Sequence, residues 1–174
     1  MEIIRPSAEY KDSYITAMRE FQNDTDFPAR YRDVDADILA ARFDDFILEE
    51  IEKSEGKHLS IGFVPETVFW LVDKNEYIGR VAIRHKLTEH LRQTGGQIGY
   101  EVRPSKRKLG YGTQLLKLAL IKAKELGVDK VLLTCDVTNI ASKNIIIHAG
   151  GKYEGEGPGE RDDGPRKYRY WIST

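Results

Sequence analysis

Apolar residues recur along the 174-residue chain with two spacings, one typical of amphipathic helices and the other typical of strands. The helical spacing predicts helices over residues 7–21, from Asp35 or Asp37 to Ser54, from 113 to 126 and over 140–149, and the mostly polar stretch at residues 23–32 predicts a loop. Runs of β-branched and aromatic residues predict strands over residues 2–5, 67–73, 77–85, 99–102, 130–134 and 168–172, with one more before the glycine-rich loop at 155–164. The expected order is therefore β-α-α-β-β-β-α-β-α-β-β.

This order predicts a fold of the α/β class with mixed α+β character. A strand, a helix and a strand in the middle of the chain indicate a right-handed parallel crossover, while the hairpins indicate antiparallel flanks. We therefore expect a central mixed, twisted sheet of about six to seven strands with helices on both faces. The length suits one domain over residues 1–174 with a sizeable core.

Composition excludes several classes of partner. The chain is 40% hydrophobic and 32% charged, and its formal net charge is −1, so no overall field attracts nucleic acid or an anionic membrane. Cys135 is the only cysteine, which excludes an internal disulfide and fits a reducing compartment. No apolar run is long enough to cross a bilayer. We expect a cytoplasmic protein without nucleic-acid, membrane or metal partners.

The candidate chemistry centres on residues 99–113, where a strand runs through basic residues into a long helix. The first turn of a helix carries backbone N–H groups without an intrahelical partner, and the helix dipole favours an anion there. Gly110 and Gly112 let the backbone approach a phosphate closely, while Arg107 and Lys108 add positive charge. The stretch therefore predicts a phosphate-binding cradle.

The same residues, taken alone, leave other interpretations open. The third glycine and the acidic residue of a dinucleotide-binding fingerprint are missing. No Gly-Lys-Ser/Thr closes the loop, which argues against a P-loop. A plain glycine-containing turn into a helix is the remaining alternative.

Arg107-x-x-Gly110-x-Gly112 between a strand and a helix resembles the pyrophosphate signature of GNAT-type N-acetyltransferases. Asn139-x-x-Ser142, on a segment that ends in two glycines, resembles the second cofactor segment of that superfamily. The resemblance covers about residues 77–153, and the element order is that of the GNAT fold over nearly the whole chain. It implies acetyl-CoA as co-substrate and direct transfer of an acetyl group to a primary amine of a small molecule or peptide.

The resemblance also implies roles for individual residues. Backbone N–H groups of residues 108–113 would hold the pyrophosphate beside Arg107, and the strand edge at Tyr100 and Val102 would bond the pantetheine arm. Asn139 and Ser142 would contact the cofactor too, although a helix cap is an alternative role for Asn139. The implied cofactor-binding residues are Tyr100, Val102, Arg107, Lys108, Leu109, Gly110, Tyr111, Gly112, Thr113, Asn139 and Ser142.

Two positions at which relatives carry catalytic groups differ in this chain. Ile146 stands where many members carry a tyrosine that protonates the leaving thiolate, and Gly96 stands where some carry a carboxylate base. Water or Tyr153 could protonate the thiolate instead, which leaves the acid unassigned. The candidate bases are Glu101, the nearest carboxylate, and a group between the two central strands, His85, Glu89 and His90. We take Glu101 and His85 as the leading catalytic candidates.

The remaining candidates have plain alternatives. Cys135 has no evident histidine partner and is expected to be a small core residue rather than a nucleophile. Five aspartates could form an acidic rim for a protonated amine or a solvated loop with helix-start acids: Asp24, Asp26, Asp33, Asp35 and Asp37. Two rival functions stay open, namely transfer of another acyl group from coenzyme A and a poorly catalytic acetyl-CoA sensor or scaffold. The aromatic final strand could pair between subunits to give a homodimer.

Overall fold

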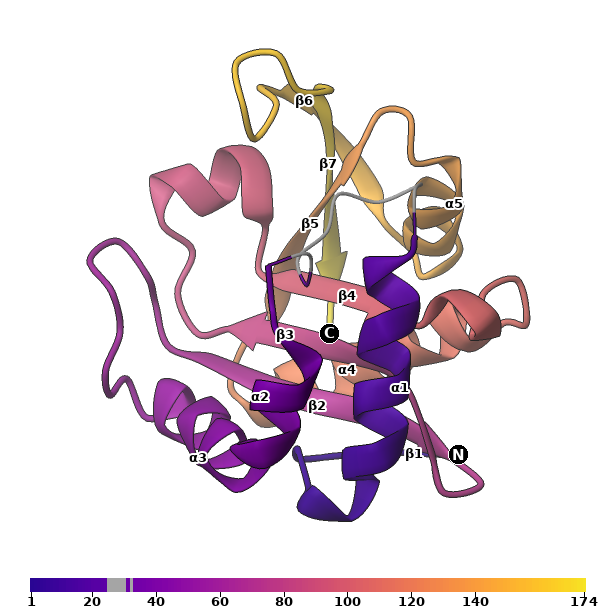
Figure 1. The fold of residues 1–174 in the computed structure, drawn as a ribbon. Helices are drawn as coiled ribbons and strands as arrows, with labels where there is room; N and C mark the ends of the chain where they lie inside the picture. Colours follow the sequence, from indigo (N-terminus) through magenta and orange to yellow (C-terminus); the bar gives the residue numbers. More distant parts are fainter. Residues whose placement is uncertain (25–30, 32) are drawn as a thin grey trace.

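The computed structural model describes residues 1–24, 31 and 33–174, and its helices and strands follow the expected order (Figure 1). The elements are β1 (Glu2–Ile4), α1 (Lys11–Gln22), α2 (Ala36–Ala41), α3 (Phe43–Ser54), β2 (Glu66–Asp73), β3 (Glu76–Arg84), β4 (Ile98–Val102), α4 (Tyr111–Glu125), β5 (Lys130–Asp136), α5 (Ile140–His148), β6 (Lys152–Gly157) and β7 (Lys167–Ser173). Most of the loop predicted at residues 23–32 lies outside the described residues.

The seven strands of the described residues form two antiparallel sheets, with the orders β1-β2-β3-β4 and β5-β7-β6. The expected parallel pairing of β4 with β5 is limited to the entry into β4, where Gln97 N donates to Leu132 O over 2.7 Å. A Cβ atom at Gly96 would lie 2.6 Å from Leu132 O, so only glycine permits this close approach. Beyond it, no ladder joins β4 to β5 within the described chain, and one edge of β4 is left open.

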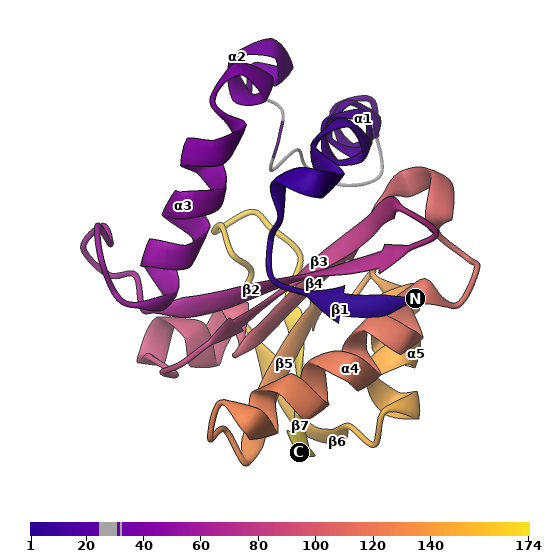
Figure 2. The same ribbon diagram turned by 90° about the horizontal axis from the view of Figure 1, so that it is seen from below.

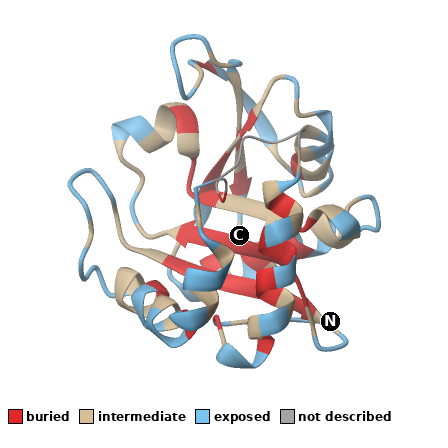
Figure 3. Ribbon diagram, in the orientation of Figure 1, coloured by how far each residue is buried: buried red, intermediate tan, exposed pale blue. Residues whose placement is uncertain are grey.

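Helices cover both faces of the first sheet (Figure 2). The helices α1, α2 and α3 pack on one face, and α4 and α5 pack on the other. Alternating residues of β2 serve the two faces: Val68 and Trp70 join the core under α1–α3, while Phe69 and Leu71 join the core under α4 and α5. Buried residues are concentrated in the strands between these layers (Figure 3).

The helix predicted from Asp35 or Asp37 to Ser54 is two helices. Asp35 is the N-cap of α2, which agrees with one of the two predicted starts. Its side chain accepts hydrogen bonds from the N–H groups of Asp37 and Ile38. Arg42, with φ of −111° and ψ of 29°, separates α2 from α3. The break allows α2 to pack on α1 while α3 packs on β2, which one straight helix could not do.

Candidate active site

The N-terminus of α4 is a backbone cradle without a side-chain cap. Gly110 precedes the helix in the left-handed conformation with φ of 85°, and Lys108 also has a positive φ, of 62°. Within the described residues, no backbone N–H group of residues 108–113 donates a hydrogen bond to another protein atom. Unpaired N–H groups at a helix N-terminus are what an anion site requires.

Glycine is favoured at the two positions of the cradle for different physical reasons. At Gly110 a Cβ atom would meet nothing within 4 Å, so the positive φ is what favours glycine. At Gly112 a Cβ atom would lie 2.9 Å from Ile145 Cδ1 and 3.9 Å from Val102 Cγ2. This second glycine therefore lets the start of α4 approach both α5 and the end of β4.

The open edge of β4 presents backbone groups of two predicted cofactor residues. Arg103 N donates to Ile78 O on β3, so in an antiparallel strand Glu101 also faces β3 and the groups of Tyr100 and Val102 face away. Val102 O on this outer edge accepts from Arg107 Nε over 3.2 Å. An extended, amide-bearing chain could pair with this edge as an added strand would.

Arg107 lies beside the end of α1 in this structure. Its Nη2 is 2.7 Å from Asp24 Oδ2, and its guanidinium is 5.9 Å from the centre of the Phe21 ring. Lys108 and Leu109 are exposed where the chain enters the cradle. Contact between Arg107 and a bound diphosphate would therefore require the guanidinium to turn from Asp24 towards the cradle.

Two other cradle residues belong to the first turn of α4. The Tyr111 hydroxyl donates to Asp73 Oδ2 over 2.9 Å, which fastens the start of the helix to the end of β2. Thr113 is the third residue of the helix, so its backbone N–H has no intrahelical acceptor.

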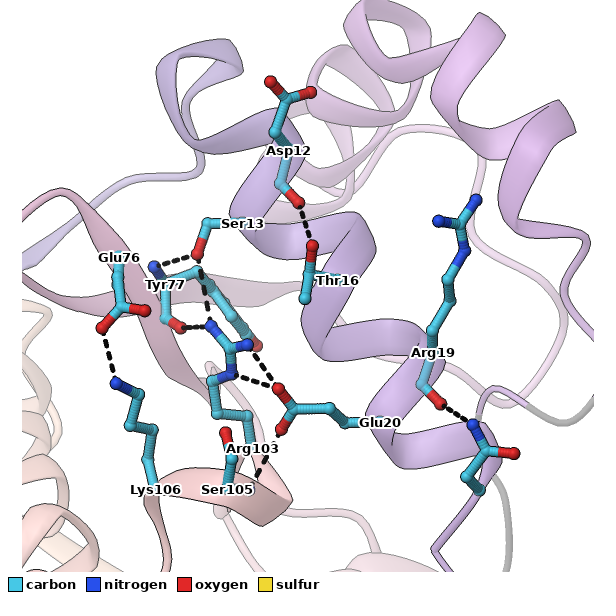
Figure 4. A network of polar contacts seen from close by, with 11 residues as sticks. Asp12, Ser13, Thr16, Arg19, Glu20, Glu76, Tyr77, Arg103, Ser105 and Lys106 are labelled. Atoms are coloured by element: carbon cyan, nitrogen blue, oxygen red, sulfur yellow. Dashed lines mark hydrogen bonds and ion pairs between the residues drawn. The ribbon is translucent and has the colours of Figure 1, made fainter.

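A polar network fixes α1 to the segment that leads into the cradle (Figure 4). Arg103, only 5% exposed, donates through Nε and Nη2 to Glu20 Oε1, and Ser105 N donates to Glu20 Oε2 over 3.0 Å. Arg103 Nη1 donates to Tyr77 O over 3.1 Å and to Ser13 Oγ over 3.3 Å. The Arg103 guanidinium thus links α1 and β3 to the segment that leads into the cradle.

Glu20→Gln is expected to lower the free energy of unfolding by about 1–3 kcal/mol, because the buried Arg103 loses its counter-charge. Burial raises the pKa of Glu20, but hydrogen bonds from Arg103 and Ser105 outweigh it and hold that pKa below its ordinary value. A lowered folded-state pKa contributes stability above the unfolded pKa, and this contribution is lost as pH falls through the folded pKa.

Urea unfolding of Glu20→Gln and wild type between neutral and acidic pH measures this effect. The difference in stability should be largest near neutral pH and should shrink on acidification. Asp12→Asn, at an exposed position of the same helix, is the control and should cost less than about 1 kcal/mol. Equal losses for the two variants would contradict the role of Glu20.

The second predicted cofactor segment begins with a helix cap. Asn139 Oδ1 accepts from Ser142 N over 3.0 Å at the start of α5. Ser142 Oγ lies 2.9 Å from Tyr100 Oη, which joins α5 to β4 on the side of the open edge. Burial raises the pKa of Tyr100 to about 12, so this hydroxyl keeps its proton at neutral pH. Ile146 is fully buried in the core under α4 and α5 and offers no proton.

Glu101 and Tyr100 follow each other on β4, so their side chains point to opposite faces of the sheet. Tyr31, in the core under α1–α3, donates its hydroxyl to Glu101 Oε1 over 2.5 Å. Burial and the Glu101 carboxylate raise the pKa of Tyr31 well above its ordinary value, which makes it a lasting donor. Arg80 on β3 is the cross-strand partner of Glu101.

His85 follows the last residue of β3, five positions beyond Arg80, which places it about 16 Å along the strand from the partner of Glu101. Its Nε2 lies 2.8 Å from Thr67 Oγ1. Burial and nearby Arg5 lower the pKa of His85, so the ring is neutral at pH 7. The structure does not bring His85 and Glu101 together, and Glu89 and His90 lie at the exposed start of a short helical segment before β4.

The predicted acidic rim is dispersed. Asp24 pairs with Arg107, Asp37 pairs with Arg19 over 2.8 Å, and Asp35 caps α2. Asp33 and Asp35 do line a surface pocket of about 320 Å³ at α2, while Asp26 lies outside the described residues.

Cys135 is buried in β5. Burial raises the pKa of its thiol to about 11, so the nucleophilic thiolate is scarce at neutral pH. This agrees with the prediction of a core cysteine.

Sequence reasoning missed Tyr31 and Arg80. Tyr31 stands in a stretch without periodicity, and Arg80 interrupts a run of apolar strand residues. A charged residue inside a strand buried on both faces was the available signal for Arg80, since such a residue is rare without a partner.

An open strand edge followed by an uncapped helix N-terminus suits a ligand with an extended amide-bearing arm and a diphosphate, which fits the class of acyltransferases that use a coenzyme A thioester. The sequence comparisons agree with this class. The acetyltransferase (GNAT) family matches residues 16–146, more than half of the chain, and the chain belongs to this family. It is an N-acetyltransferase of the GNAT type.

Solved acetyltransferases share the fold at low sequence identity. The microcin C7 self immunity acetyltransferase MccE, in complex with acetyl-CoA and AMP, is 17% identical with a TM-score of 0.72, over 99% of this chain and 91% of that chain. The ribosomal alpha-N-protein acetyltransferase RimL, in complex with coenzyme A, is 12% identical with a TM-score of 0.72, over 98% and 92%. Mycobacterium smegmatis RimJ, in complex with CoA-disulfide, is 15% identical with a TM-score of 0.73, over 99% and 81%.

A comparison with curated proteins found no match. Among residues 1–24, 31 and 33–174, no helix has the length and apolar character needed to cross a bilayer. In the same residues, no group of three or more histidine, cysteine, aspartate or glutamate side chains could hold a metal ion.

Proposed function

We propose that the protein transfers the acetyl group of acetyl-CoA directly to a primary amine of a small molecule or peptide, with Glu101 as the base. The observation that carries this proposal is the position of Glu101. It lies on β4 between the two residues whose backbone faces the open edge, and its carboxylate accepts from Tyr31 under α1–α3. One short strand thus presents a cofactor-binding edge and a proton acceptor side by side.

The residues present fit the co-substrate at both ends. The unpaired N–H groups of residues 108–113 suit its diphosphate, and the outward backbone groups of Tyr100 and Val102 suit the amides of its arm. When bound, acetyl-CoA supplies an activated acetyl group whose thiol departs on transfer.

Glu101 removes the proton that the acceptor nitrogen must lose as it forms its bond to the acetyl carbon. The Tyr31 hydroxyl, donated to Oε1, leaves Oε2 of Glu101 to accept this proton and holds the carboxylate in place. Water protonates the departing thiolate, because α5 lacks the tyrosine of its relatives and burial holds the pKa of Tyr100 at about 12, above the ordinary thiol pKa of about 8.5.

One observation favours a second candidate function. Ile146 is fully buried where relatives carry the acid, which fits a domain that binds acetyl-CoA as a sensor or scaffold and catalyses poorly. This alternative predicts tight binding of acetyl-CoA without turnover.

Acetyl transfer is tested by mixing the protein with acetyl-CoA and a panel of polyamines, aminoglycosides, amino acids and peptides, and by following free thiol. Thiol release above the hydrolysis of acetyl-CoA alone is expected with at least one amine, and acetylated product should appear by mass spectrometry. Binding without release for every amine would favour the sensor. Propionyl-CoA in place of acetyl-CoA tests transfer of other acyl groups.

A further inference from the structure

A cavity of about 220 Å³ lies between the first sheet and the helices α1–α3, and two of its lining residues, Tyr31 and Arg80, are neighbours of Glu101. Its walls combine aromatic and aliphatic side chains, among them Tyr14, Leu39, Phe46 and Trp70, with the Glu50–Lys53 ion pair. The cavity volume is below the ~300 Å³ of pockets that hold drug-sized ligands, so the cavity suits one amino-acid side chain rather than a large ring system.

One wall of this cavity carries a hydrogen-bond donor without an acceptor. Arg80 is only 4% exposed, and its Nη2 is buried without a hydrogen-bond partner among the described residues. This nitrogen lies 3.7 Å from Glu50 Oε2 and 3.8 Å from Glu66 Oε1, which balances its charge but gives no hydrogen bond. A buried donor in this state gains free energy from any ligand oxygen that reaches it.

The charges around Arg80 favour a neutral ligand oxygen over an anionic one as the hydrogen-bond acceptor. Burial lowers the pKa of Arg80, but Tyr31, Glu101 and Glu50 outweigh it and hold that pKa above its ordinary value, so the guanidinium stays charged. Three carboxylates, those of Glu50, Glu66 and Glu101, already surround this one cation. Another anion would be repelled, whereas a neutral carbonyl oxygen would accept from Nη2 without a charge penalty.

Arg80 and Glu101 are directly opposed on β3 and β4, so their side chains leave the same face of the sheet with Cβ atoms about 4.5–5.5 Å apart. A ligand at this pair is met by a proton acceptor at Glu101, a hydrogen-bond donor at Arg80 and an apolar cavity beside both. The α-carbon of an amino-acyl unit carries the matching groups: an amine, a carbonyl and a side chain.

We propose that the acceptor is the α-amine of a peptide or amino-acid amide whose first residue has an apolar side chain of about leucine size. This inference rests on the proposed acetyl transfer and names its substrate class. The amine lies at Glu101, the neutral carbonyl oxygen at Arg80 Nη2, and the side chain among Tyr14, Leu39 and Phe46. The N–H proton passes to Glu101, the new bond is N–C(acetyl), and the C–S bond breaks.

Four small amines separate the features of this acceptor. Leucinamide has all three groups, isopentylamine lacks the carbonyl, free leucine has a carboxylate, and glycinamide lacks the side chain. Rates are compared per unprotonated amine, because the ordinary pKa of an α-amine is about 7.7–8.0 and that of an alkylamine about 10.4. Leucinamide is expected to exceed isopentylamine in kcat/KM by at least about 100-fold, since the latter leaves the buried donor unpaired. It should exceed leucine and glycinamide by at least about 10-fold.

Three variants test which residues give this preference. Arg80→Lys removes the second guanidinium nitrogen while keeping the charge, and it should lower the preference in kcat/KM for leucinamide over isopentylamine by about 10- to 100-fold. Arg84→Lys, at the neighbouring arginine that also lies near Glu66, should not change the preference. Leu39→Trp fills the cavity and should shift the preference from leucinamide to glycinamide.

Calorimetric binding of the four amines in the presence of coenzyme A tests the cavity apart from catalysis. Transfer or binding without preference for leucinamide over isopentylamine would overturn this inference and leave the proposed acetyl transfer intact. Preferential binding of leucinamide without any transfer would overturn the proposed transfer while supporting the cavity assignment.

Discussion

Glu101→Gln should lower kcat by about 10²- to 10³-fold with little change in the affinity for coenzyme A, because it removes the proposed base and leaves the backbone edge of β4 and the cradle unchanged. Glutamine keeps an oxygen that can accept the Tyr31 hydroxyl, so the hydrogen bond of 2.5 Å to β4 has a replacement. Steady-state thiol release measures kcat, and calorimetric titration with coenzyme A measures the affinity.

His85→Gln is the matched control for Glu101→Gln, since it alters the other candidate base by an exchange to the same residue. His85 lies at the far end of β3 beside Thr67, so turnover should change by less than about threefold. A large loss in His85→Gln together with normal turnover in Glu101→Gln would assign the base to the histidine and contradict the proposed mechanism.

The order of elements could be predicted from the sequence because it depends on local pattern. The helical stripes and the runs of β-branched residues occur where the structure has helices and strands, from β1 to β7. The break at Arg42 was missed, because apolar spacing continues across it and only the packing of α2 on α1 requires the bend. The sequence also did not predict that β4 and β5 pair only at the entry into β4. This pairing depends on a contact between Gly96 and Leu132, which are 36 residues apart in sequence.

The candidate site also has one part that local sequence predicts and another that depends on long-range contacts. The cradle is contiguous, so its glycines and the start of α4 could be located from the sequence. The proposed acceptor side is assembled from β3, β4 and the chain before α2, and no sequence spacing predicts that Arg80, Glu101 and Tyr31 lie close together. The ion-pair partners of charged residues could not be predicted from the sequence either. Asp24 was expected on an acidic rim, but it pairs with Arg107 of the cradle.

Gly112→Asp is expected to weaken binding of coenzyme A by more than about 100-fold, because it places a negative charge where the cradle would receive the diphosphate. A Cβ atom at this position would lie 2.9 Å from Ile145 Cδ1, so some loss of stability is expected from packing alone. The charge itself lies in the first turn of α4, where an acidic residue favours the helix dipole. The fold should therefore survive the substitution.

Gly112→Ala separates packing from charge, because it adds the same Cβ atom without a carboxylate. Calorimetric titration with coenzyme A and thermal unfolding of both variants give affinity and stability independently. If the cradle holds the diphosphate, alanine and aspartate should destabilise the fold similarly, while only aspartate should abolish binding. Equal affinity losses would mean that the approach of α4 to α5, rather than the anion site, is what Gly112 provides, and unchanged affinity in both would remove the cradle from residues 108–113 altogether.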